Sequence, residues 1–156
     1  MRSKQKGFSL IELLIVVAII LIIAAIAIPN LLRSKMAANE ASAVGSMRTL
    51  NTAAVTYSTT YGGYPAGLSN LGPAATASST TADLVDSVLS GGTKSGYTFV
   101  WSAAAPDTAG NIQSYSITAA PVTPNTTGQR YFYTDQSGVI RANPAAAANI
   151  NSTPIS

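Results

Sequence analysis

One acidic side chain stands near the start of an otherwise apolar stretch. Glu12 is followed by residues 13–28, which carry no charge, and the stretch ends at Pro29. A carboxylate at the centre of a membrane helix raises the free energy of insertion by about 2.5–3.5 kcal/mol, and by less near the end of the helix. A lipid-facing helix gains nothing from Glu12, so this residue requires a separate explanation.

The stretch has the length and the flanking charge of a membrane-spanning helix. From Phe8 to Ile28 a helix extends roughly 31 Å at about 1.5 Å per residue, and the hydrocarbon core of a bilayer is about 30 Å thick. Basic residues are retained on the cytoplasmic side of such a segment. Three of them precede Phe8, namely Arg2, Lys4 and Lys6.

Two ordinary explanations account for this length but not for Glu12. A secretory signal peptide has a basic start, an apolar region and small residues before the cut, which residues 25–27 provide. A plain membrane anchor needs only the apolar length. Either would place the rest of the chain outside the cytoplasm, as a secreted or membrane-anchored binding domain.

A third explanation starts from residues 6–14, Lys-Gly-Phe-Ser-Leu-Ile-Glu-Leu-Leu, which run on through apolar residues to Pro29. This segment resembles the N-terminus of type IV pilins and pseudopilins, closely over residues 1–30 and more loosely over 30–61. The resemblance implies that a dedicated membrane peptidase cuts between Gly7 and Phe8 and methylates the new amine of Phe8. It also implies that Glu12 takes part in filament assembly.

Physical chemistry supports that role for Glu12. Cleavage after Gly7 exposes the α-amine of Phe8, which is charged near neutral pH because model amines have a pKa of about 7.7–8.0. An amine one helical turn away, or on a neighbouring subunit, stabilises the carboxylate. Since each charge is unfavourable alone in an apolar setting, we hypothesise that pairing them fixes the axial register between subunits.

Composition excludes several classes of function. The chain has no Cys and no His, so Ser-His-Asp and Cys-His catalysis, disulfides and ordinary zinc sites are excluded, and we predict that it is not an enzyme. Nine basic residues oppose six acidic ones, but three of the basic residues precede Phe8. The remaining chain is formally neutral and gives no support for specific nucleic-acid binding.

The spacing of apolar residues predicts one long helix from Phe8 to Tyr61. Pro29 lacks a backbone N–H and is expected to open the helix locally without ending it. Gly62 and Gly63 provide the stop signal. The second half is predicted to be amphipathic, with one stripe for a sheet to cover. The apolar positions of this half are Leu32, Met36, Ala43, Met47, Leu50, Ala54, Tyr57 and Tyr61.

The sequence after Tyr61 predicts an irregular connection over 62–95 and then an antiparallel sheet over 96–142. A short helix is expected over 82–90, with Thr80 and Asp83 resembling a capping box. Alternating residues predict strands, and the tail 143–156 is expected to be loosely held. The fold class is therefore α+β and pilin-like, a long helix packed on three to four strands. The expected strands are 96–102, 112–120, 129–134 and 139–142.

Other groupings of side chains have ordinary structural interpretations. Asp107, Asn111 and Asp135 could offer oxygen ligands to calcium, but their spacing matches no dense ligand loop and aspartate commonly starts turns. We therefore predict no metal and no cofactor, with calcium as the alternative. Asp83 and Asp86 are expected to be solvated. The aromatic residues alternate at strand spacing, which predicts core and sheet packing; they are Tyr97, Phe99, Trp101, Tyr131, Phe132 and Tyr133.

The resemblance implies three segments and a route to the cell surface. Residues 1–7 form a leader, 8–29 a transmembrane and filament-core helix, and 30–156 a globular domain. We predict the major subunit of a type IV pilus, with a pseudopilin of a type II secretion system as the alternative. The expected partners are further copies of the chain, the prepilin peptidase and the inner-membrane assembly machinery. The precursor would span the cytoplasmic membrane once, with its C-terminal domain outside, before entering a surface pilus used in adhesion or twitching motility.

Overall fold

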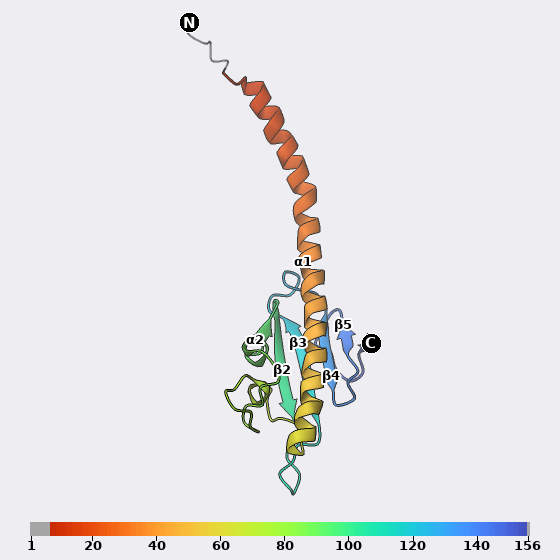
Figure 1. The fold of residues 1–156 in the computed structure, drawn as a ribbon. Helices are drawn as coiled ribbons and strands as arrows, with labels where there is room; N and C mark the ends of the chain where they lie inside the picture. Colours follow the sequence, from red (N-terminus) through yellow and green to blue (C-terminus); the bar gives the residue numbers. More distant parts are fainter. Residues whose placement is uncertain (1–6, 156) are drawn as a thin grey trace. The chain divides into compact units, whose positions relative to one another are not determined.

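The computed structural model describes residues 7–155 and begins with a single long helix. Helix α1 (Leu10–Tyr61, 52 residues) confirms the predicted helix and starts two residues later than expected. The chain divides into two compact units, residues 1–35 and residues 36–156, and α1 contributes to both. Figure 1 follows α1 in red to yellow and the sheet in green to blue.

The first unit is a bare apolar helix. Of its described residues, none is buried, and large side chains such as Phe8, Leu10 and Ile26 are more than half exposed. This segment is long and apolar enough to cross a membrane. Burial of apolar area from water contributes roughly 25 cal/mol per Å², so a helix of this kind requires lipid or protein around it.

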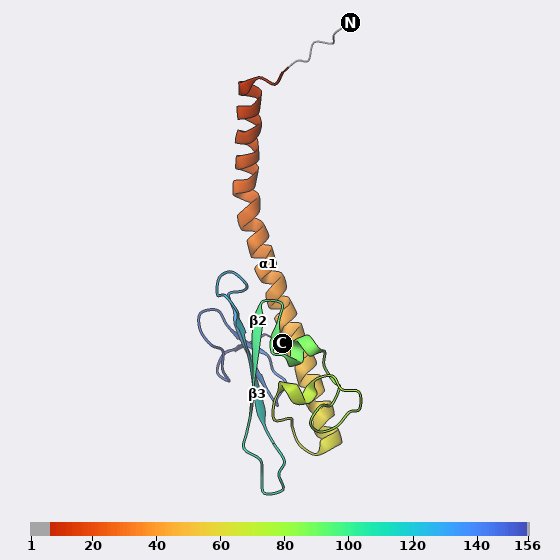
Figure 2. The ribbon, with the colours of Figure 1, turned by 90° about the vertical axis from the view of Figure 1, so that its left-hand side faces the viewer.

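The second unit packs the C-terminal half of α1 against one face of a sheet, as Figure 2 shows. The buried helix residues recur every three or four positions from Glu40 to Tyr57, which confirms most of the predicted amphipathic stripe. Leu32 was also predicted to belong to the stripe, but it is 49% exposed and lies in the first unit. They meet the aromatic and branched side chains of the strands, and this contact is the core of the unit. The buried apolar residues of α1 are Ala43, Met47, Leu50, Ala53, Ala54 and Tyr57, and their partners on the strands include Phe99, Ile117 and Phe132.

The sheet is an antiparallel meander in which every strand pairs with the next along the chain. It has six strands rather than the predicted three to four, because two-residue strands close each edge. A strand of two residues is too short to show the alternation of apolar and polar residues that predicts strands from a sequence. The strands are β1 (Thr93–Lys94), β2 (Tyr97–Ala103), β3 (Tyr115–Pro121), β4 (Tyr131–Asp135), β5 (Arg141–Asn143) and β6 (Thr153–Pro154).

The connection between α1 and the sheet differs from its prediction. The expected helix over 82–90 is reduced to α2 (Ser87–Ser90), and its N-cap is Asp86, not Thr80. The N–H groups of residues 82–85 donate instead to carbonyls of residues 70–72, so they are not available for a helical turn. A 3₁₀ helix, η1 (Leu68–Leu71), was not predicted and buries both of its leucines.

The C-terminal tail is also more ordered than predicted. Strand β6 pairs with β5, and the N–H of Ile155 donates to the carbonyl of Ile140 over 2.9 Å. The Arg141 guanidinium donates to the carbonyl of Ser152, and Ala148 is buried. The expectation of a loosely held tail is therefore wrong, because its backbone completes the edge of the sheet.

Candidate processing and assembly site

The predicted cleavage point lies in extended chain just before α1. Residues 7–9 are not helical, and Gly7 and Phe8 are exposed, with 83% of Phe8 accessible. A backbone segment outside regular structure can enter a protease active site without unfolding a helix. The structure therefore leaves this peptide bond accessible, while cleavage and methylation remain predictions.

Glu12 takes part in the cap of α1. Its Oε2 accepts from the backbone N–H of Ser9 over 2.8 Å, and the Oγ of Ser9 accepts from the N–H of Ile11 over 3.4 Å. These contacts form a capping box, in which the first helical N–H groups gain acceptors that the helix itself cannot supply. A negative charge in the first turn is also favourable beside the positive end of the helix dipole.

Ser9 was not singled out from the sequence, although a signal was present. Ser9 and Glu12 form the pattern Ser-x-x-Glu before an apolar run, which is the sequence mark of a capping box. The structure thus gives Glu12 an intramolecular partner in addition to the amine expected after cleavage. Its role in register stays a hypothesis.

Pro29 lies inside α1, which is assigned helical from end to end. Because proline has no N–H, the carbonyl four residues before it, that of Ala25, has no helical donor at this position. A helix of this kind is weakened at one point even where it stays continuous. The predicted opening of the helix at Pro29 therefore remains a prediction for the assembled state.

A second polar anchor, absent from the sequence predictions, fixes the β3–β4 loop on α1. Glu40 Oε1 accepts from the N–H groups of Gln129 and Arg130 over 2.8 and 3.1 Å. Its Oε2 accepts from the Arg130 Nε over 2.7 Å, and Asn39 donates to the carbonyl of Thr127. No sequence pattern links residues so far apart in the chain.

The surroundings of Glu40 act on its pKa in opposite directions. Burial disfavours the charged form and raises the pKa, whereas the hydrogen bonds from Gln129 and Arg130 favour it. The hydrogen bonds prevail, and the pKa of Glu40 lies below its ordinary value. Glu40 is therefore a charged, fully bonded acceptor that joins helix and loop.

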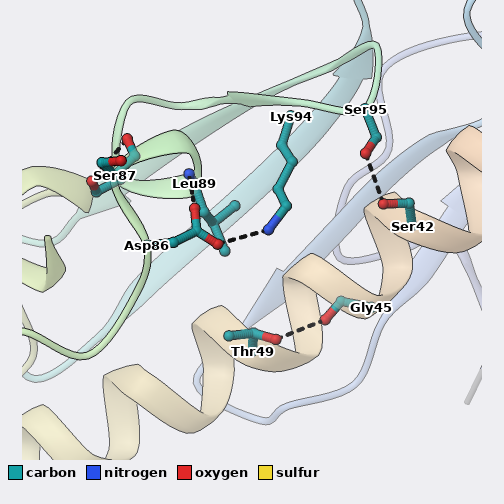
Figure 3. A network of polar contacts seen from close by, with 9 residues as sticks. Ser42, Gly45, Thr49, Asp86, Ser87, Leu89, Lys94 and Ser95 are labelled. Carbon is teal, nitrogen blue, oxygen red and sulfur yellow. Dashed lines mark hydrogen bonds and ion pairs between the residues drawn. The ribbon is translucent and has the colours of Figure 1, made fainter. Parts of the chain in front are cut away.

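A smaller network, drawn in Figure 3, holds a second loop of the same unit on α1. Asp86 caps α2 through the N–H of Leu89 over 2.7 Å and pairs with Lys94 over 2.8 Å. In the turn after Lys94, Ser95 accepts from Ser42 of α1 over 2.9 Å. The turn between β1 and β2 and the loop between β3 and β4 thus both contact α1 near residues 39–42.

The candidate calcium ligands have structural roles in two turns. Asp107 accepts from the N–H groups of Ala109 and Asn111 and from the Gln113 amide, and Asp135 accepts from the N–H of Ser137. These are the bonds of turn-initiating aspartates. Within residues 7–155, no three or more His, Cys, Asp or Glu side chains gather as for a metal. The calcium alternative stays untested.

Most of the aromatic residues of the sheet confirm the packing interpretation, whereas Tyr131 and Tyr133 are half-buried and lie outside the core cluster. Tyr97, Phe99 and Phe132 are buried in the core. Trp101 stacks on Tyr115 with ring centroids 4.4 Å apart. These rings contribute to the hydrophobic core and stabilise the contact between sheet and helix.

Comparison with protein families identifies the N-terminal segment. Residues 2–28 match the model described as the prokaryotic N-terminal methylation motif. The match covers the predicted leader, the cleavage point, the capping box and most of the apolar helix. It confirms the resemblance to prepilin-type N-termini drawn from residues 1–30.

Curated relatives match the same end of the chain. A type IV major fimbrial protein FimA of Dichelobacter nodosus is 56% identical over 52 residues, 31% of this chain and 33% of the relative. The type IV wide pilus major component PilA4 of Thermus thermophilus is 66% identical over 35 residues, 22% of this chain and 27% of the relative. The chain thus spans about a third or less of the length of these relatives.

Proposed function

We propose that the chain is a structural subunit, the major pilin, of a type IV pilus and not an enzyme. The observation that carries this proposal is the methylation motif joined to an apolar helix without a single buried residue between 8 and 35. The relatives that share this segment are named as major components of type IV fimbriae and pili. A long antiparallel meander on the second half of α1 provides the globular part.

The exposed helix requires two successive surroundings. In the precursor, lipid covers residues 8–29, the basic leader stays in the cytoplasm, and the globular unit lies outside. In the filament, helices of other copies replace the lipid, so the apolar area stays out of water during extraction. The inner-membrane assembly machinery would drive that exchange.

The sheet itself is a poor route to polymerisation. Its edge strands have two residues each, and they carry Lys94 on β1 and Pro154 on β6. Short edges with a lysine or a proline discourage pairing with another chain. The exposed part of α1 is therefore the main surface through which copies associate.

Cleavage by the prepilin peptidase would complete the assembly site. The Glu12 carboxylate already lies beside the N–H of Ser9, one residue from Phe8. Once Phe8 carries a charged amine, Glu12 can pair with it, or with the amine of a neighbouring copy, and register follows from that pairing.

Analysis of sheared surface filaments tests the proposal. Mass spectrometry should find a mature chain that begins at methylated Phe8, and electron microscopy should find long pili. A mature start at Ile28 would support an ordinary signal peptide and overturn the proposal. Short secretion-dependent filaments without surface pili would instead favour the pseudopilin of a type II secretion system.

The Glu12→Ala variant tests the assembly role, and Ser9→Ala is its matched control. Both changes weaken the helix cap, which costs about 0.5–2 kcal/mol, but only Glu12→Ala removes the carboxylate. We expect Glu12→Ala to abolish filaments and Ser9→Ala to retain most of them, as measured by sheared-filament yield. Wild-type yield from Glu12→Ala would contradict the register hypothesis.

A further inference from the structure

The solvent-facing side of α1 in the second unit has an unusual composition. A helix face that stays in water normally carries charged residues opposite its apolar stripe. Here the exposed face bears a single charge, on Arg48, among small residues and threonines. Its exposed members include Ala41, Gly45, Thr49, Thr52, Val55 and Thr56.

The hydroxyl groups on this face already have acceptors. Thr49, Thr52 and Thr56 donate to the carbonyls of residues 45, 48 and 52 over 3.0–3.1 Å; Figure 3 shows the first of these bonds. A donor that is already satisfied does not lose a water partner when it is covered. The face can therefore be buried against protein with little cost in unpaired polar groups.

A hollow of about 350 Å³ lies on this face and has Leu84 on its lining. The preceding residue, Asp83, is exposed and adopts φ 54°, a left-handed conformation that is uncommon for a residue other than glycine. Its N–H donates to the carbonyl of Gly72 over 2.9 Å, and residues 82, 84 and 85 are bonded in the same way. The carboxylate of Asp83 is thus presented on a fixed backbone.

Asp83 also stands apart among the charges of residues 7–155, where six basic and six acidic residues balance. Two acids form ion pairs, and three others accept backbone N–H bonds in a cap or a turn. Within this part of the chain, Asp83 has neither a side-chain hydrogen bond nor an ion pair. Arg33, Lys35 and Arg48 are likewise exposed, with no ion pair among the described residues. Of these cations, Arg48 lies on the docking face itself, whereas Arg33 and Lys35 lie toward the other end of α1.

We propose that this face of α1, with Arg48 as its single charge, docks a second copy of this chain and that Asp83 pairs with the Arg33–Lys35 segment of that copy. Charge complementarity selects the occupant, because the acid without a partner and the cations without partners belong to the same chain. Arg33 and Lys35 are two positions apart, so they point to opposite sides of the helix. This inference rests on the proposed filament and names one contact within it.

Charge reversal tests the contact in cells that assemble the full chain. Asp83→Lys should lower the yield of sheared filaments at least about tenfold, because like charges then meet at every copy. Because Arg33 and Lys35 point to opposite sides of the helix, one of Arg33→Glu and Lys35→Glu, added to Asp83→Lys, should restore the yield. Failure of both to restore it would overturn the proposal. The matched control is Asn125→Lys, which adds a cation at another exposed residue with positive φ and should leave the yield unchanged. Wild-type yield from Asp83→Lys would overturn the proposal.

Cross-linking decides the matter where a charge variant fails to fold or insert. The chain has no native cysteine, so an Asp83→Cys chain can be co-expressed with an Arg33→Cys or Lys35→Cys chain. A short bifunctional thiol reagent should then join the two chains in filaments, and a pair of Asp83→Cys and Asn125→Cys chains should stay unlinked. Filaments without the cross-link overturn this inference, whereas a wild-type chain that forms no filaments overturns the proposed function instead.

Discussion

Glu40 shows how one residue can join distant parts of the globular unit. It lies on α1, and its three acceptor bonds reach Gln129 and Arg130, about ninety positions along the chain. Its side chain is 11% exposed, whereas that of Arg130 is 45% exposed. Solvent therefore screens the ion pair in part.

The lowered pKa of Glu40 predicts an acid-dependent contribution to stability. A carboxyl with a folded pKa below its ordinary value of 4.5 stabilises the fold above that pH. This contribution is lost as the pH falls through the folded pKa. Glu40→Gln should therefore lower the free energy of unfolding by about 1 kcal/mol at pH 7, as measured by urea denaturation of the full chain in detergent.

The comparison across pH separates charge from packing. As the pH falls through the lowered folded pKa of Glu40, the wild type and Glu40→Gln should approach equal stability, because both then present a neutral side chain. Other carboxyl groups with a lowered pKa, such as those of Asp86 and Asp107, titrate alike in the wild type and in Glu40→Gln. A stability difference that does not shrink at any acid pH at which the wild type stays folded would contradict the electrostatic account.

Among the elements, α1 carries a glycine, Gly45, at a position where a side chain would have space. A Cβ added to Gly45 would meet no atom within 4 Å apart from the helix's own nearby backbone. Glycine inside a helix costs about 0.5–1 kcal/mol relative to alanine. Gly45→Ala should raise the stability of the unassembled chain by about that amount, which the urea midpoint in detergent measures.

Gly128 provides the contrasting substitution. A Cβ at this position would collide with the ring and hydroxyl of Tyr97, a fully buried residue that donates to the carbonyl of Arg130 over 2.8 Å. Gly128→Ala should therefore destabilise the same chain by about 1–3 kcal/mol, the usual cost of overpacking. Equal effects of the two glycine substitutions would show that the close packing around Tyr97 does not constrain the loop.

At the scale of the whole globular unit, the last residues of the chain close the sheet. Ala148 is 5% exposed and belongs to the segment that returns from β5 to β6. The chain has no cysteine and hence no disulfide, and this segment is held by backbone pairing and by the bond from Arg141 to Ser152.

The substitution Ala148→Asp tests whether the tail contributes to stability. An unpaired carboxylate at a buried position should destabilise the unit by about 2 kcal/mol or more and increase proteolysis of the C-terminus. The exposed neighbour Ala146, changed to Asp, should have little effect. Limited proteolysis followed by mass spectrometry measures both, and equal cleavage of the two variants would contradict a packed tail.

The sequence by itself determined the features that depend on local pattern. The span of α1, its apolar first half and amphipathic second half, the four longer strands and the methylation motif all follow from periodicity, charge placement and the N-terminal motif of residues 6–14. Glu12 stood out because a carboxylate in an apolar run is costly in any fold. The Ser9–Glu12 capping box was equally local and could have been found.

Only the tertiary structure decided which distant groups share bonds. The shortening of α2 follows from N–H groups of residues 82–85 that bond to residues 70–72, and strands β1 and β6 exist only because a neighbouring strand offers them an edge. The Glu40–Arg130 anchor likewise depends on long-range packing. Two-residue strands and contacts across ninety positions produce no periodic pattern in the sequence. Their physical cause is the packing of distant segments in the folded chain.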